Sequence, residues 1–153
     1  MKLQIAVALS HQAKLLIMDE PTSGLDPVVR NEILQIFQEF VMEEDHTILL
    51  SSHIIGDLER IADMITFIDR GKILLSGNKD DILEKHGMIK CTKDDMNRIE
   101  KQDIVCVRRS AFETEVLVSD RKLCSNKYPD LLIEPASLEE IMLFYVERNR
   151  REQ

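Results

Sequence analysis

The stretch LLIMDEPTSGLDP, residues 15–27, most narrowly limits what this chain can fold into. Its first four residues are apolar, which is typical of a buried strand, and Asp19 and Glu20 follow where that strand ends. Pro, Thr, Ser and Gly then form a turn, Asp26 can cap a helix, and Pro27 suits the first helical position. The stretch therefore predicts a strand, an acidic turn and a helix in direct succession.

The same alternation of strands and helices continues to about residue 86. We expect helices at about 2–12, 27–44 and 54–62, and strands at 15–18, 47–51, 64–69 and 72–77. Arg70 and Gly71 form a tight turn between the last two strands. Continuously apolar strands separated by helices are typical of a mainly parallel sheet covered on both faces, so the predicted fold class is α/β.

The pattern changes near residue 87. All five glycines lie at or before Gly87, and residues 1–86 carry a net charge of −7 against −1 for the remainder. After Gly87 the sequence predicts strands in MIKCTK, DIVCVRR and TEVLVSD, a short helix in DDMNRIEK, and a final helix that starts with a capping box of Ser137 and Glu140. We therefore predict two parts, residues 1–86 and a small α+β extension at 87–153.

Composition excludes several classes of protein. The net charge of −8 argues against a nucleic-acid partner, because phosphate neutralisation needs clustered cations. Cys91, Cys106 and Cys124 are odd in number and widely spaced, which favours reduced thiols over a disulfide framework. No run approaches the roughly 18 apolar residues of a membrane-spanning helix, so a membrane role would pass through a partner protein.

The carboxylates at the end of the first strand suggest a chemistry. In open α/β sheets ligands bind beyond the carboxyl ends of parallel strands, where Asp19 and Glu20 lie. One carboxylate can hold a hydrated Mg²⁺ and the other can orient a water, as nucleotide hydrolysis requires. The second strand, TILLSS, leads to His53, which can donate to a phosphate oxygen. An isolated Asp-Glu pair would be interpreted as two solvated acids in a loop. Here the turn at residues 22–26 and the strand before His53 follow the pair, and they favour the functional interpretation.

These residues resemble a known family. LLIMDEPTSGLDP is similar to the Walker B motif and D-loop of ATP-binding-cassette (ABC) ATPases, TILLSSH is similar to their H-loop strand, and KLQIAVALSHQAKL is similar to the helix after their signature loop. The resemblance covers about residues 1–86 and implies the C-terminal part of a P-loop NTPase fold. The tail EPASLEEIMLFYVE resembles cassette subunits of bacterial ABC-2-type exporters.

The resemblance also implies roles, a cofactor and partners. Asp19 would contact Mg²⁺ through water, Glu20 would polarise the attacking water, and His53 would sense the γ-phosphate of ATP. Four turn residues would lie where two cassettes close over ATP: Ser23, Gly24, Leu25 and Asp26. The partners would be a transmembrane permease subunit and a second ATP-binding subunit, which would place the chain in the cytoplasm at the inner face of the cell membrane.

The Walker A and signature motifs of the family are missing. No GxxxxGK[ST] phosphate loop (Walker A) occurs in the 153 residues, and the signature motif would precede Met1. We therefore expect a C-terminal portion of a cassette subunit that is inactive alone, with exposed apolar surface that favours self-association.

Three alternatives stay open. The chain could be a truncated, non-catalytic cassette that acts as a binding or regulatory module. It could belong to a soluble ABC ATPase that takes no part in transport. A metal-dependent hydrolase built on Asp19, Glu20 and His53 is a third possibility, but it leaves the turn after Glu20 unexplained.

Overall fold

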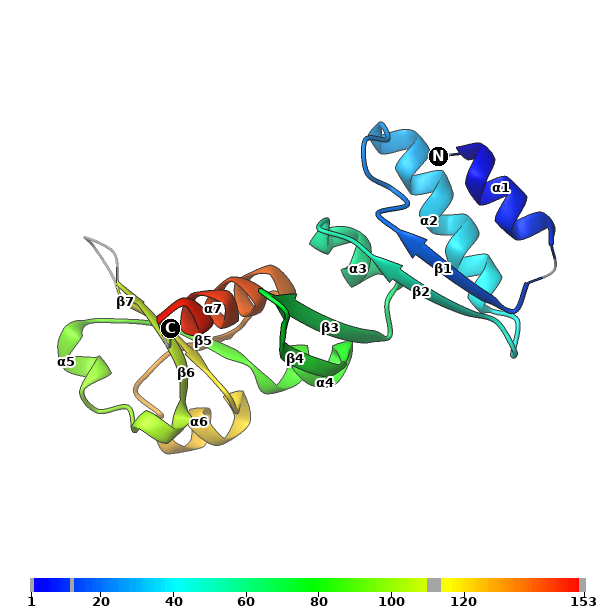
Figure 1. Cartoon of the computed structure of the whole chain (residues 1–153). Coiled ribbons are helices and arrows are strands. Elements are labelled where there is room, and N and C mark those ends of the chain that lie inside the picture. The colour runs from blue at the N-terminus through cyan, green and yellow to red at the C-terminus, as the bar shows by residue number, and fades with distance from the viewer. Residues whose placement is uncertain (1, 12, 110–113, 152–153) are drawn as a thin grey trace. The chain divides into compact units, whose positions relative to one another are not determined.

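The protein forms two compact units, Met1–Ala62 and Asp63–Gln153 (Figure 1). The computed structural model describes residues 2–11, 13–109 and 114–151. The predicted division into residues 1–86 and an extension at 87–153 stays a prediction.

The first unit follows the predicted order of elements. They are α1 (Lys2–Ser10), β1 (Leu15–Asp19), α2 (Pro27–Val41), β2 (Thr47–Ser51) and α3 (Ile55–Ile61). Asp26 caps α2 as predicted, because its Oδ1 accepts the N–H groups of Val28 and Val29, each at 3.1 Å. Helix α1 ends two residues before the predicted limit, and residue 12 lies outside the described residues.

Strands β1 and β2 form a parallel pair in which Asp19 lies opposite Ser51. Helices α1 and α2 pack on one face of this pair (Figure 1). The buried side chains of that core come from the two helices: Ile5, Ile33, Leu34 and Phe37. The opposite face leaves Leu15, Ile17 and Leu49 exposed, so the prediction of a sheet covered on both faces is wrong for this pair.

The second unit contains most of the strands. Its elements are β3 (Met64–Asp69), β4 (Lys72–Asn78), α4 (Lys79–Lys85), β5 (Gly87–Cys91), α5 (Lys93–Met96), a 3₁₀ turn (Lys101–Asp103), β6 (Ile104–Arg109), β7 (Thr114–Val118), α6 (Arg121–Lys127), β8 (Ile133–Pro135) and α7 (Leu138–Arg151). The sequence did not predict α4, α6 or β8. The two helices have seven residues each and the strand has three, and segments this short show no clear apolar periodicity.

The two sheets that the structure describes in the second unit are antiparallel, so among the described strands the prediction of a mainly parallel sheet holds only for β1 and β2. In the hairpin of β3 and β4, Arg70 and Gly71 have φ values of +49° and +75°. Positive φ at both central residues suits a tight hairpin turn, and two residues can join only antiparallel strands. The larger sheet has the order β6-β7-β5-β8.

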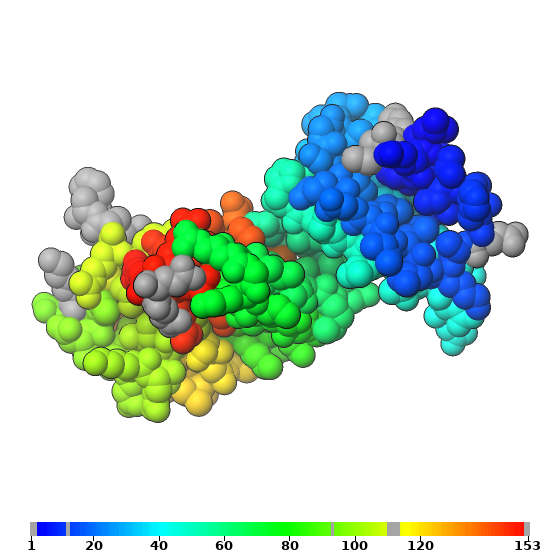
Figure 2. All heavy atoms as spheres, in the orientation of Figure 1, coloured from blue at the N-terminus to red at the C-terminus, as the bar shows by residue number. Residues whose placement is uncertain are grey.

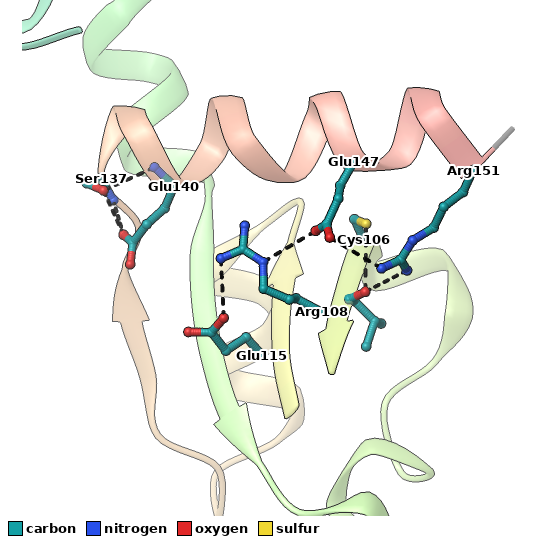
Figure 3. Close-up of polar contacts among 8 residues, drawn as sticks. Cys106, Arg108, Glu115, Ser137, Glu140, Glu147 and Arg151 are labelled. Atoms are coloured by element: carbon teal, nitrogen blue, oxygen red, sulfur yellow. Dashed lines mark hydrogen bonds and ion pairs between the residues drawn. The ribbon is translucent and has the colours of Figure 1, made fainter. Parts of the chain in front are cut away.

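Polar contacts link helix α7 to the larger sheet (Figure 3). The predicted capping box forms, with the Ser137 N–H donating to Glu140 Oε2 at 2.8 Å and the Glu140 N–H donating to Ser137 Oγ at 3.3 Å. On β6, Arg108 lies 3.4 Å from Glu147 of α7 and stacks 4.6 Å from the centre of the Phe144 ring. The capping box stabilises the start of α7, and the contacts of Arg108 hold the helix on the sheet.

Candidate functional site

Asp19 is the last residue of β1 and lies on the uncovered face of the parallel pair. The Ser51 hydroxyl, directly opposite on β2, donates a hydrogen bond to Asp19 Oδ1. The Asp19 side chain is exposed, so its carboxylate is available to an approaching ligand. The prediction that this acid emerges at the end of a strand agrees with the structure.

Glu20 and His53 contact each other directly. His53 Nδ1 lies 2.8 Å from Glu20 Oε2, and the two side chains are 68% and 33% exposed, respectively. Since an ionised carboxylate only accepts hydrogen bonds, Nδ1 carries the donated proton, and Nε2 is left for another contact. The structure thus brings together two residues that are 33 positions apart in the sequence.

The backbone of Glu20 is unusual. Its φ of +48° lies in the left-handed region, which costs a non-glycine residue about 1–2 kcal/mol. Its N–H still donates to the Ser51 carbonyl at 3.1 Å, so the strand ladder extends one residue past β1. The left-handed turn re-aims the Glu20 side chain toward His53, which simple strand alternation does not predict.

The four turn residues differ in their surroundings. Gly24 is exposed and has a φ of +71°, a conformation that favours glycine. Leu25 packs against the core of the first unit. Asp26 is directed to the N-terminus of α2, as its cap. Ser23 is half-buried, and its N–H donates to the Glu20 carbonyl at 3.2 Å. Their predicted place at a cassette interface stays a prediction.

Sequence reasoning missed three polar residues at this site. Ser51 contacts both Asp19 and the Glu20 backbone, and the sequence did not mark it, because the register of β1 and β2 sets it opposite Asp19. The Thr22 hydroxyl donates to Asp57 Oδ2 at 2.7 Å, and both residues are buried. No local pattern marks the pair of Thr22 and Asp57, because 35 positions separate them.

A hollow of about 200 Å³ is lined by residues of α1, of β1 and of the turn that follows β1. Its lining comes from Gln4, Ile5, Ala8, Ile17, Met18, Asp19 and Pro21. Figure 2 shows the blue atoms of α1 and β1 at the surface of the first unit. Asp19 therefore contributes to the lining of this hollow.

The described residues give little support for a metal site held by protein ligands alone or for a cysteine nucleophile. Within residues 2–11, 13–109 and 114–151, no three His, Cys, Asp or Glu side chains gather closely enough to hold a metal ion by themselves. Burial raises the pKa of the thiols of Cys91, Cys106 and Cys124, which are free and buried. Such thiols are poor nucleophiles. None of the helices in the described residues has the length and hydrophobicity of a transmembrane segment.

Comparison with known proteins points to one class. The chain is 47% identical over 79 residues to the lantibiotic transport ATP-binding protein SrtF of Streptococcus pyogenes, a match that covers 52% of this chain and 34% of SrtF. It is 33% identical over 122 residues to the linearmycin resistance ATP-binding protein LnrL of Bacillus subtilis, with 80% of this chain and 39% of LnrL covered.

A third relative is the energy-coupling factor transporter ATP-binding protein EcfA2 of S. pyogenes, which is 38% identical over 88 residues, or 58% of this chain and 31% of EcfA2. No protein-family model matches the chain. The chain spans between about a third and two fifths of the length of these curated relatives.

The chain is therefore homologous to part of the ATP-binding subunits of ABC transporters. That homology implies the P-loop NTPase class of fold, and the structure itself is mixed α/β. It also agrees with the resemblance carried by residues 15–27 and by the strand before His53.

Proposed function

We propose that the chain is the C-terminal portion of an ATP-hydrolysing subunit that drives transport by an ABC transporter, in which Glu20 polarises the attacking water and His53 contacts the γ-phosphate. The observation that carries the proposal is the 2.8 Å contact between Glu20 and His53 at the ends of adjacent parallel strands. Phosphoryl transfer depends mainly on such positioning and on charge neutralisation.

The residues present fit a magnesium ion. Mg²⁺ prefers oxygen ligands and is commonly held by one or two carboxylates while it keeps several waters. Asp19 offers one exposed carboxylate whose orientation is fixed by Ser51, which fits a hydrated ion better than a cage of protein ligands. When bound with ATP, the ion would supply charge neutralisation for the phosphates.

The proton arrangement at His53 limits its role. Nδ1 donates to Glu20, and a phosphate oxygen also only accepts hydrogen bonds. To contact phosphate, His53 must either donate from Nε2 as an imidazolium ion or turn its Nδ1 proton away from Glu20. Either change alters the partner of the Glu20 carboxylate as well, which would link phosphate binding to the residue that acts on water.

The partners follow from the same proposal. Ser23, Gly24, Leu25 and Asp26 would face a second ATP-binding subunit, and a transmembrane permease subunit would hold the chain at the cytoplasmic face of the membrane. The relatives SrtF and LnrL are named for lantibiotic transport and linearmycin resistance. Together with the tail at residues 134–147, these names favour an exporter.

The test uses the chain alone and joined to a relative. Because the 153 residues contain no GxxxxGK[ST] loop, we expect the purified chain to show no magnesium-dependent ATP hydrolysis. A chimera that joins the preceding part of LnrL to this chain should hydrolyse ATP. Glu20→Gln should lower kcat of the chimera about 100-fold or more, whereas Glu43→Gln, at an exposed acid after α2, should not.

Two results would count against the proposal. Equal hydrolysis by the Glu20→Gln chimera would remove Glu20 from the chemistry. A folded chimera that binds a second subunit but never hydrolyses ATP would favour the alternative of a non-catalytic binding or regulatory module, which the missing phosphate loop also supports.

A further inference from the structure

The contact between Glu20 and His53 cannot hold itself in place. His53 is 68% exposed and Glu20 33% exposed. An exposed pair of this kind contributes little to stability, because solvent screens it and two side chains must be ordered. Glu20 also has a left-handed backbone, a conformation that persists only where the surroundings enforce it.

One restraint on this contact lies upstream of it. The Glu20 N–H donates to Ser51, through the backbone carbonyl at 3.1 Å and the hydroxyl oxygen at 3.2 Å. These bonds extend the parallel ladder of β1 and β2. They fix the Glu20 N–H against β2 but do not themselves anchor the residues after Glu20 to α3.

The second restraint lies downstream and is buried. Thr22, two residues after Glu20, donates its hydroxyl proton to Asp57, four residues after His53, at 2.7 Å. Thr22 is 2% and Asp57 is 5% exposed. Breaking this bond would leave a buried carboxylate without its partner, which costs more than the loss of an ordinary hydrogen bond.

We propose that Thr22 and Asp57 are positioning residues whose buried hydrogen bond holds the Glu20 carboxylate against the His53 imidazole. The bond closes a ring of contacts in which Glu20 and His53 are the exposed pair and Thr22 and Asp57 the buried pair. The inference rests on the proposed function only in naming Glu20 and His53 as the reacting residues, and the geometry can be tested without nucleotide.

The test measures the ¹⁵N chemical shifts of the His53 imidazole by NMR, at one fixed pH, in the 153-residue chain. Glu20→Gln should shift the Nδ1 resonance, because it removes the carboxylate that accepts the proton. The combined variant Thr22→Val with Asp57→Leu removes the buried bond without leaving an unpaired buried group, a replacement that can be nearly neutral for stability. It should move the Nδ1 resonance to the Glu20→Gln value, and adding Glu20→Gln should then change nothing.

Two further variants separate positioning from general stability. Thr22→Ser keeps the hydroxyl and should keep the wild-type shift. Asn31→Ala removes a different hydrogen bond to α3, the 2.8 Å bond from Arg60 of α3 to Asn31 of α2. It should leave the His53 resonance unchanged. If the combined variant does not fold, Thr22→Val alone is compared with Thr22→Ser at a temperature where both retain the amide spectrum of the first unit.

Several outcomes would overturn the inference. They are a wild-type Nδ1 shift in a folded variant that lacks the buried bond, an equal displacement in Asn31→Ala, and no response of His53 to Glu20→Gln in the wild-type chain. Because the measurement needs no ATP, a chimera without hydrolytic activity would refute the proposed function and leave this result standing.

Discussion

The hydroxyl of Tyr128 donates to the Asp103 carboxylate at 2.7 Å, and Asp103 is only 8% exposed. Lys127 donates to the same carboxylate oxygen at 2.8 Å, and the Glu100 N–H donates to the Tyr128 oxygen at 3.0 Å. These bonds join the 3₁₀ turn before β6 to helix α6.

Tyr128→Phe should destabilise the second unit by roughly 1.5 kcal/mol, the lower end of the range for a hydrogen bond to a charged group, because Lys127 remains bonded to Asp103. Urea unfolding followed by NMR peaks of the β5–β8 sheet measures the change. Tyr145→Phe is the matched control, since it removes a neutral hydrogen bond of 3.1 Å to His86 and should cost less. An equal or larger loss in the control would contradict the assignment.

The same cluster predicts an acid limit of stability. The hydrogen bond from Lys127, followed by that from Tyr128, holds the pKa of Asp103 below its usual value. A lowered folded-state pKa stabilises the fold above the unfolded-state value of about 3.9, and this stability is lost as pH falls through the lower folded value. Lys127→Met should therefore raise the pH at which the second unit unfolds in acid. An unchanged midpoint, read by circular dichroism against pH, would exclude this role for Lys127.

Gly87→Ala should displace strand β8 from β5. A Cβ at position 87 would lie 2.7 Å from Cγ2 of Ile133 and 2.9 Å from Cγ of Arg121, closer than carbon atoms approach in proteins. Overpacking of this kind costs about 1–3 kcal/mol. Gly77→Ala is the control in the same unit, because its Cβ would meet Ile82 at an ordinary 3.8 Å. Faster hydrogen exchange at Ile89 in Gly87→Ala alone is the expected result.

Asp26→Ala should destabilise the first unit by about 1 kcal/mol, the usual cost of losing a helix cap. Asp26→Asn should cost little, since asparagine caps helices about as well as aspartate. Thermal unfolding followed by amide peaks of α2 separates the two variants. If Asn proves as damaging as Ala, the negative charge of Asp26 at the N-terminus of α2, rather than its capping hydrogen bonds, stabilises the helix.

The uncovered face of β1 and β2 should make the isolated chain self-associate. Leu15, Ile17 and Leu49 are 54%, 73% and 62% exposed on neighbouring positions of one sheet face. Such apolar patches favour association in water. Sedimentation should show oligomers that Ile17→Lys together with Leu49→Lys converts to monomer. Leu132→Lys, at a 75% exposed position of the second unit, should have no effect. A monomeric wild-type chain would refute the prediction.

The sequence predicted the local features well, and the candidate site only in outline. Asp26 and Pro27 mark the start of α2, Ser137 and Glu140 form their capping box, and Arg70 with Gly71 forms the hairpin turn. Each of these depends on residues within four positions of one another. Periodicity also found β1 and β2, but it could not show that the later strands pair antiparallel.

The order of residues 15–53 is enough to show that two acids follow a buried strand and that a histidine follows another. It does not show that Glu20 lies 2.8 Å from His53, through a left-handed backbone and a buried bond between Thr22 and Asp57, which became visible in the folded chain. The reason is physical: these contacts join residues more than 30 positions apart, and their geometry depends on strand register and burial. Those two quantities exist only once the chain has folded.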